Sequence, residues 1–430
     1  MRRFANLILM ATFIVILISS FTIYHIFTNT SIPQYTSSEV SEEIVLTCFN
    51  YFTAEGAVFA ERFPEAVKEQ FPNVTIEMEI IEWNKMHPTI EARFAANEVP
   101  DIMVLKSQDI PTYAPTGNLM DLTGQPFLDN VIELSRQSII IDGREYGIPY
   151  NALYQGVFYN REIFSEKNLS IPQTYDELIK ICEKLESQGI TPFSTHLMDV
   201  WHIANMTMQF AMVEVFNKNP NWGYDLFDGK VSFSTSDEYR RVFEIMKDIR
   251  KYTFEDTFTY DQMKAVELFA KGEAAMMVTG TWNCDIIERF NPKLDYGIFP
   301  FPGRDSETKL LFEPNYTWAG SSRSENKELI LKILEFIARD KELARYCAET
   351  SKTQSMIKGV DIISHNSISS DINKYIRANK VVDVNIGNIQ IKWDYQEEYS
   401  RYIQEWLLDK ITLDEALEAA DQYMYKTRYK

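Results

Sequence analysis

Two stretches of this chain show the same order of segments, an apolar strand followed by a helix, and this alternation restricts the fold more than any other feature. Residues 44–49 are a continuous apolar run, as in a strand buried on both faces. Residues 55–71 then repeat apolar side chains at helical spacing, and strand patterns follow at 74–80 and 101–105. Strands that alternate with helices need crossover connections, so we expect an α/β fold with parallel sheets.

A second stretch begins after a Gly-Ile-Pro turn at residues 147–149. Residues 156–160 read as a strand and residues 174–188 as a helix, with Thr174 as N-cap and Glu177 three residues later. Further helices are predicted at 236–251, 260–271, 325–339 and 412–425. A chain of 430 residues can form two such α/β units, and clefts between lobes are preferred ligand sites.

The N-terminus carries a long apolar segment. Residues 4–27 follow two arginines and contain no acidic or basic side chain except His25. As a helix this segment would be about 36 Å long, against about 30 Å for the hydrocarbon core of a bilayer. No small-residue cleavage pattern follows it, and no cysteine precedes Cys48 to accept a lipid. We therefore expect residues 1–28 to be a membrane anchor rather than a cleaved signal peptide, with a polar linker at 29–43 and the remainder outside the cell.

Charge and cysteine content narrow the choice of partners. The chain has 43 Lys and Arg against 62 Asp and Glu, a net charge of −19 at pH 7. Nucleic acid and anionic membrane surfaces both need a basic face, so neither is expected as a partner. The four cysteines lie far apart without metal-binding spacing. We expect them to be buried as small apolar side chains, with disulfide pairing as the alternative.

Motifs of the common catalytic classes do not occur. The sequence has no phosphate-binding loop, no dinucleotide-binding glycine pattern, no nucleophile elbow and no zinc-protease motif. A pair of glycosidase carboxylates is defined in space rather than in sequence, so this one class of enzyme stays open. We therefore expect a binding protein without a metal or cofactor rather than an enzyme.

Several short motifs, taken in their order along the chain, carry a further indication. They are PDIMV at 100–104 with YAPTGNL at 113–119, DGREYGIP at 142–149 with FYNREIF at 158–164, FAKGEAAMM at 269–277 with GTW at 280–282, DYGIFPFPG at 295–303, and TLDEAL at 412–417. Together they resemble the extracellular solute-binding proteins of bacterial ABC importers, in the carbohydrate-type family that includes maltose- and oligosaccharide-binding proteins. The lipidated cysteine common in Gram-positive members is missing here, so the anchoring must differ.

The resemblance covers about residues 44–425 and implies a periplasmic-binding-protein-like fold, α/β in class, with a ligand cleft between two lobes. It places the first lobe at residues 44–152 plus 316–350 and the second at residues 155–313 plus 351–430. The chain is expected to cross between them near 151–156, 312–317 and 349–357.

Candidate aromatic contacts follow from the chemistry of sugars. Sugars present apolar C–H faces that pack on aromatic planes, and hydroxyls that bond to planar polar groups. Trp282 follows a Gly-Thr turn after the apolar strand at 274–278, as the family's cleft tryptophan does. Four other tryptophans are candidates by position, with an ordinary core role as the alternative for each: Trp201 in an expected loop at 195–203, Trp393 before the C-terminal helices, Trp318 at the second crossing, and Trp83 after the second strand.

Candidate polar contacts lie in segments that resemble the family's ligand loops. Glu55 follows the first strand, Asp109 follows the third, and Asn151 stands at the first crossing. For Glu55 a helix cap or a solvated charge is an equal alternative.

The function implied by the resemblance is transport. The chain would be a monomer on the outer face of a bacterial cytoplasmic membrane that binds a mono- or oligosaccharide and delivers it to the permease subunits of an ABC importer. The same fold leaves open a peptide or another non-sugar solute, or a role as a sugar sensor. The remaining alternative, an extracellular glycoside-processing enzyme, would need two carboxylates about 5–9.5 Å apart in the cleft.

Overall fold

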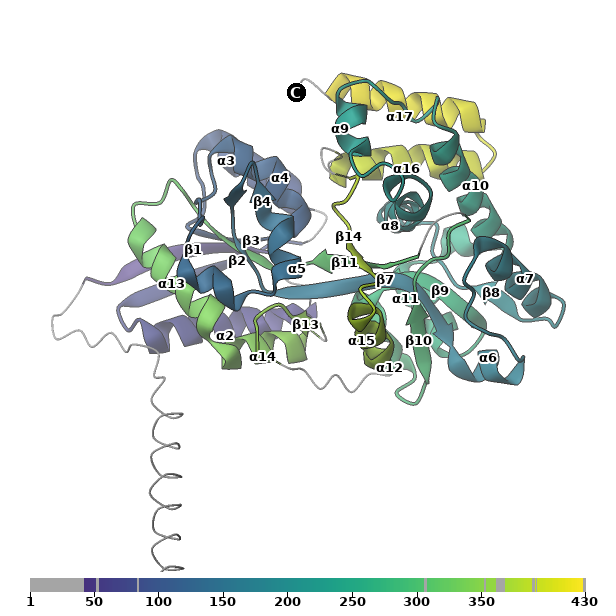
Figure 1. Ribbon diagram of the computed structural model, residues 1–430. Helices are drawn as coiled ribbons and strands as arrows, with labels where there is room; N and C mark the ends of the chain where they lie inside the picture. Colours follow the sequence, from purple (N-terminus) through teal and green to yellow (C-terminus); the bar gives the residue numbers. More distant parts are fainter. Residues whose placement is uncertain are drawn as a thin grey trace, which may run out of the picture.

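The computed structural model of the chain describes residues 42–51, 54–82, 85–304, 308–351, 353–360, 368–388, 391 and 393–427, the side chains of 54–59, 393–395 and 427 excepted. Two lobes lie side by side, each built on its own mixed β-sheet (Figure 1). The long strand β7 (Asn151–Asn160) and β11 (Leu310–Pro314) lie in the region where the lobes meet. The expected α/β class with two lobes is confirmed.

The first sheet has the strand order β2-β1-β3-β12-β6. Its strands are β1 (Ile44–Asn50), β2 (Val74–Ile80), β3 (Ile102–Leu105), β6 (Ile148–Pro149) and β12 (Thr317–Gly320). The helices of this lobe are α2 (Ala54–Gln70), α3 (Met86–Ala96), α4 (Ile110–Tyr113), α5 (Glu133–Arg136), α13 (Lys327–Arg339) and α14 (Lys341–Thr350), beside a small hairpin of β4 (Ile140–Ile141) and β5 (Arg144–Glu145). β3 is buried at all four positions, as its apolar sequence requires.

The second sheet has the order β14-β11-β7-β9-β8, and β10 and β13 also pair with β7. The further strands are β8 (Thr191–Phe193), β9 (Ala274–Gly280), β10 (Tyr296–Phe299), β13 (Gln354–Ser355) and β14 (Val381–Asp383). The expectation of purely parallel sheets is wrong. β7 carries the chain out of the first lobe and β11 carries it back, so these two strands are antiparallel, and β12 is likewise antiparallel to β3.

Helices surround the second sheet. They are α6 (Arg161–Glu166), α7 (Tyr175–Glu186), α8 (Val200–Ala211), α9 (Trp222–Phe227), α10 (Asp237–Lys251), α11 (Gln262–Ala270), α12 (Cys284–Phe290), α15 (Ser369–Arg377), α16 (Trp393–Leu407) and α17 (Leu413–Thr427). The predicted N-cap of α7 is confirmed, because the Thr174 side chain accepts a hydrogen bond from the backbone N–H of Glu177.

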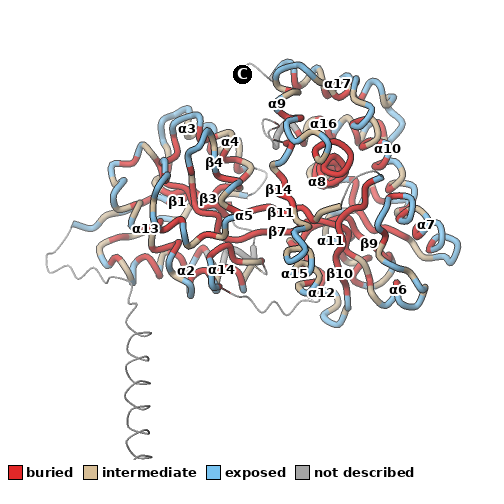
Figure 2. The backbone as a smooth tube through the Cα atoms, in the orientation of Figure 1, coloured by how far each residue is buried: buried red, intermediate tan, exposed pale blue. Residues whose placement is uncertain are grey.

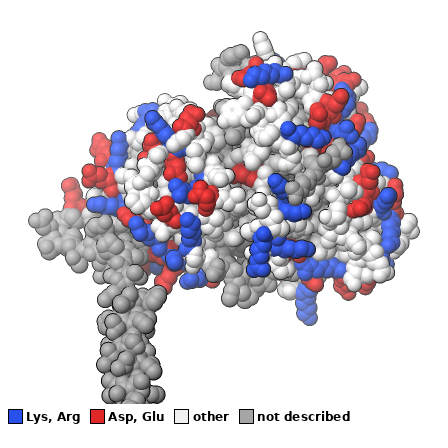
Figure 3. All heavy atoms as spheres, in the orientation of Figure 1, with Lys and Arg blue, Asp and Glu red and all other residues white. Residues whose placement is uncertain are grey.

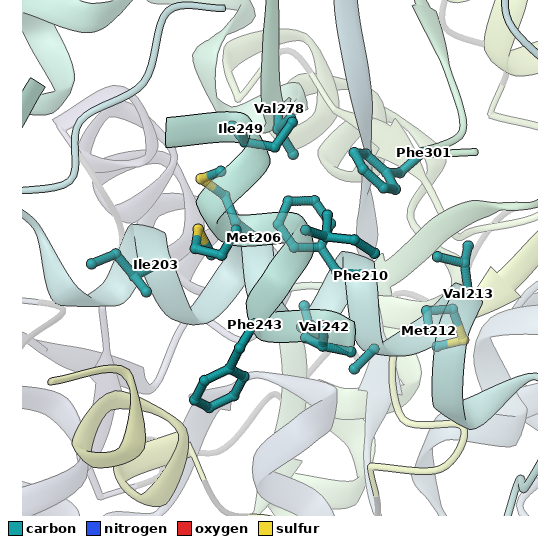
Figure 4. Packing of buried hydrophobic residues seen from close by; sticks show 14 of the residues in the cluster. Ile203, Met206, Phe210, Met212, Val213, Val242, Phe243, Ile249, Val278 and Phe301 are labelled. Carbon is teal, nitrogen blue, oxygen red and sulfur yellow. The ribbon is translucent and has the colours of Figure 1, made fainter. Parts of the chain in front are cut away.

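The sequence predicts a loop at residues 195–203, but the structure has a helix, α8, that begins at Val200. From His202 to Ala211 every residue of this helix is buried, and a π-helical turn continues it through Phe216 (Figure 2). Figure 4 shows Met206 and Phe210 of α8 packed among side chains of α10 and the sheet. A helix buried on all sides has no amphipathic stripe, so helical periodicity is a weak predictor here.

Each lobe has its own apolar core. The first includes side chains from Leu46 to Tyr150 and from Tyr316 to Val360, and the second includes side chains from Val157 to Met424. Ile357 and Val360 therefore pack with the first lobe, beyond the expected boundary at residue 350.

The cysteines are buried, as expected. Cys48, Cys182, Cys284 and Cys347 are all free thiols, and burial raises the pKa of each. Disulfide pairing, the alternative, is excluded for these four thiols.

The expected anchor at 1–28 and most of the expected linker lie outside the described residues. None of the helices in the described part of the chain combines the length and the apolar character that a bilayer span requires.

Candidate functional site

The first sheet ends in polar side chains that face one another. A short 3₁₀ turn (Ser107–Asp109) follows β3, and His87 lies in the first turn of α3. Asp109 is 5% exposed, its Oδ1 lies 2.8 Å from His87 Nε2, and its Oδ2 accepts from the backbone N–H of Lys106 at 2.9 Å. This carboxylate is therefore held by two groups of its own lobe, and its contact with a ligand stays a prediction.

A buried carboxylate connects the two lobes. Glu313, near the end of β11, is only 2% exposed. Its Oε1 accepts from Lys106 Nζ at 2.9 Å, and its Oε2 accepts from Gln155 Nε2 at 2.7 Å. Lys106 follows a strand of the first sheet, whereas Gln155 belongs to β7 of the second. A buried charge of this kind is tolerated because it is paired and hydrogen-bonded on both oxygens.

Trp282 stands next to this connection. It lies in the turn Thr281–Asn283 that follows β9, and Gly280 of β9 is paired with Gln155 of β7. A Cβ atom at position 280 would lie 2.1 Å from the indole ring, so only glycine allows the ring to rest there. The indole is half-buried, and its Nε1 has no hydrogen-bond partner among the described residues.

Trp201 rests on a pair of histidines. It lies in the first turn of α8 and its ring centroid is 5.2 Å from that of His196 and 5.7 Å from that of His202. The two imidazoles are stacked at 3.8 Å. Burial lowers the pKa of His196, against the opposing effect of Asp199, and burial lowers the pKa of His202 well below its usual value. Both shifts of pKa favour the neutral form of the rings, which lie against the indole of Trp201.

A second buried carboxyl lies at the end of β14. Asp383 Oδ1 accepts from the backbone N–H of Asn385 at 2.8 Å, while Oδ2 is buried without a partner among the described residues. Burial raises the pKa of Asp383 to about 7, the bond from Asn385 lowers it, and the charge of Glu313 raises it further. Gln155 Oε1 is also buried and has no partner in the described part of the chain.

Two predicted contacts are corrected by the structure. Trp318 is fully buried, 4.4 Å from the ring of Phe63 between ring centroids, because its strand β12 lies inside the first sheet and not at its end. Asn151 is also fully buried, and its side-chain amide is bonded to Tyr316 and Thr353.

The side chains of three predicted ligand contacts lie outside the part of the chain that the structure describes. Trp83 lies outside the described residues. Glu55 is in α2 and Trp393 is the first residue of α16, but their side chains lie outside the described part.

The comparisons with known proteins decide the family. The model of the family described as bacterial extracellular solute-binding protein matches residues 52–344, more than half of the chain. This chain belongs to that family. A relative over nearly the whole length is an uncharacterised ABC transporter extracellular-binding protein of Pyrococcus horikoshii, 24% identical over 400 residues, which cover 90% of this chain and 92% of the relative.

Two further matches agree with this membership. The diacetylchitobiose binding protein of Streptomyces coelicolor is 23% identical over 302 residues, covering 68% of each chain. A solved structure of a sugar transporter from Bacillus licheniformis in complex with stachyose superposes with a TM-score of 0.73, at 18% identity, over 88% of this chain and 99% of that one. The resemblance drawn from the short motifs is thereby confirmed.

Sequence reasoning missed several polar residues of this solute-binding protein. Glu313 and Asp383 each stand in an apolar strand, and Gln155 interrupts the apolar run of β7. A polar side chain inside a strand that is otherwise buried was the available indication, because burial of such a group demands a partner or a function. Lys106 had no comparable indication, because it lies in a loop.

Proposed function

We propose that this solute-binding protein binds a mono- or oligosaccharide between its lobes and delivers it to the permease subunits of an ABC importer. The relative named for diacetylchitobiose and the similar structure solved in complex with stachyose support a carbohydrate ligand. The proposed role is binding without chemistry, on the outer face of the membrane, with the N-terminal segment as the anchor.

One observation carries the proposal. Trp282 lies two residues after Gly280, which pairs with Gln155 of β7. Gln155 donates to Glu313, and Glu313 accepts from Lys106 of the first lobe. A half-buried aromatic ring and three polar side chains therefore come from neighbouring positions where the lobes meet. Stacking on C–H faces and hydrogen bonding to hydroxyls need this combination of groups.

A calorimetric screen tests the proposal. The full chain, purified in mild detergent, is titrated with neutral mono- and oligosaccharides, with short peptides and with metal chelates. We expect a selective sugar to bind and to be recovered unchanged, and at 100 times its dissociation constant to stabilise the fold by about 2.7 kcal/mol. Binding of a peptide or chelate with no sugar bound would overturn the proposed ligand class. Cleavage of a bound glycoside would favour the enzyme alternative.

A further inference from the structure

We propose that the stacked side chains of His196 and His202 are an acid-sensitive support for Trp201: uptake of a proton by this pair displaces the indole and weakens ligand binding. The inference rests on the proposed function only where it concerns binding. The contacts that carry it, and most of its test, belong to the ligand-free protein.

The two imidazole rings lie face to face inside the second lobe. Both are buried, their centroids are 3.8 Å apart, and their planes differ by 13°. Two positively charged rings at this distance would repel each other strongly, because the protein interior screens charge far less than water does. The pair can therefore hold at most one additional proton while it stays stacked and buried.

Hydrogen bonds show which nitrogen of each ring already carries a proton. Thr195 Oγ1 donates to Met206 Sδ at 3.3 Å, so it accepts from His202 Nε2 at 2.9 Å. His196 Nδ1 lies 2.8 Å from the Asp199 carboxylate, which only accepts. In the neutral rings, His196 Nε2 and His202 Nδ1 therefore carry no proton, and both are buried without a partner among the described residues.

A further proton has no acceptor at either of these nitrogens. It would create a charged N–H group inside the protein with no described residue to accept its hydrogen bond, which is unfavourable. Two carboxylates act on His196, namely Asp199 at the N-cap of α8 and Asp261 at the N-cap of α11, and the charge of His196 acts on His202. Burial lowers the pKa of both rings, but the carboxylates favour a proton on His196. Acid therefore protonates His196 first, and its new N–H needs contact with water.

The indole of Trp201 is the neighbour that can give way. The loop before α8 is fixed, since its carbonyls at 195 and 197 accept from Thr257 Oγ1 and Gln404 Nε2, each at 2.6 Å. Trp201 is half-buried, and its ring lies against both imidazoles. We therefore expect the indole to move away and admit water when His196 takes up a proton.

The direction of the effect follows from proton linkage. An ordinary histidine takes up its proton near pH 6.5, and the buried pair does so only at lower pH. Between these values an opened pair binds a proton that the stacked pair lacks, so a falling pH favours opening. A ligand held by Trp201 in the stacked state then loses up to about tenfold in affinity for each pH unit below the titration of the ligand-free pair.

Two substitutions keep the existing bonds and remove the titration. In His196→Asn the amide N–H replaces Nδ1–H towards Asp199, and in His202→Gln it replaces Nε2–H towards Thr195. Each amide nitrogen stands about as far from Cα as the ring nitrogen that it replaces, and neither amide takes up a proton in this pH range.

Two further variants mark single indoles in the fluorescence of the ligand-free chain. The signal of Trp201 is the difference between the native protein and Trp201→Phe. Trp222→Phe gives the matched control, because Trp222 is a buried tryptophan of the same lobe that packs on Phe233 and Tyr239 rather than on histidine.

Acrylamide quenching of the full chain in mild detergent, from pH 8 to pH 4.5, gives the ligand-free result. We expect the quenching constant of Trp201 to rise about twofold in acid, that of Trp222 to stay level, and the rise to disappear in His196→Asn. A Trp201 signal that does not change with pH, or an equal rise in His196→Asn, would overturn the proposal. If His196→Asn does not fold, His202→Gln and the native contrast between Trp201 and Trp222 decide instead.

The effect on binding is measured with the sugar that binds in the calorimetric screen. Its dissociation constant should rise between pH 7.5 and pH 5 in the native protein and stay level in His196→Asn. An equal rise in both proteins would overturn the connection between the pair and binding. The quenching experiment needs no sugar, so failure of the proposed sugar binding is a separate result.

Discussion

Asp109, at the end of the first sheet, and Asp383, at the end of the second, differ in how their carboxyl oxygens are satisfied. At the end of the first sheet, Asp109 is bonded on both oxygens and Lys106 is paired with Glu313. At the end of the second, Trp282 Nε1 and Asp383 Oδ2 are buried without partners in the described residues. A buried polar atom without a partner costs about 1–3 kcal/mol, so such atoms are rare unless function requires them.

The difference concerns what these side chains can offer a ligand. In the first lobe, Asp109 and Lys106 are already held by neighbouring groups. In the second lobe, Trp282 Nε1 and Asp383 Oδ2 keep hydrogen-bonding capacity that no described residue uses. Charge on one visible face of the molecule does not distinguish the lobes, because Lys, Arg, Asp and Glu are mixed over both (Figure 3). The contrast therefore lies at the strand ends, and the predictions below test it.

The largest expected effect concerns two tryptophans that sequence analysis both named as candidate ligand contacts. Trp318→Ala should lower the free energy of unfolding by about 3–5 kcal/mol, because it empties a fully buried site in the first core. Trp282→Ala should cost distinctly less, since its ring is half-buried. Urea unfolding followed by circular dichroism measures both values. Similar losses would contradict the assignment of only one of them to the core.

Loss of the ion pair between Lys106 and Glu313, which joins the lobes, should have the next largest effect on the free energy of unfolding. Glu313→Ala leaves Lys106 without its carboxylate and should lower the free energy of unfolding by about 3 kcal/mol. Glu335→Ala is the matched control, because it breaks an ion pair of similar length with Arg339 in which both side chains are 42% exposed. That loss should be at most about 0.5 kcal/mol by the same urea measurement. Equal losses would show that Glu313 is not a buried link.

Asp383 should give the second lobe a stability that depends on pH. Its pKa is about 7 in the fold against 3.8 ordinarily, so the folded state holds a proton that the unfolded state has lost between these values. Its contribution to stability is therefore complete below about pH 4 and is lost as the pH rises to 7. The measurement is urea unfolding of the native protein and of Asp383→Asn from pH 4 to 8.

The difference between the two proteins isolates this group. Asp383→Asn should gain relative to the native protein as the pH rises, by about 2 kcal/mol above pH 7, roughly half of the full linkage value because buried sites relax. A difference that does not change with pH would show that Asp383 is ionised throughout the range. Asp383 would then no longer count as an unsatisfied group at the end of the second sheet.

The sequence predicts local secondary structure better than it predicts contacts between distant side chains. Local patterns predicted β2 and the N-cap of α7 correctly, because alternation and capping act over a few residues. α8 was missed, since burial on all sides removes its periodicity. Glu313 and Asn151 are bonded to partners far away along the chain, and the tertiary fold decides those pairs. Sequence order alone does not contain these long-range pairings.

The last prediction concerns ligand affinity rather than stability, and it is specific to Trp282. Trp282→Ala should weaken binding of the sugar identified by calorimetry by about 1–3 kcal/mol, because a buried aromatic contact is lost. Trp282→Phe keeps a ring but not the indole N–H, and should recover part of this loss. Tyr425→Ala removes an aromatic side chain that is 71% exposed on α17, and its affinity should match the native protein. If all three variants bind alike, the aromatic plane of the second lobe is not the ligand platform, and the contrast between the strand ends then concerns stability alone.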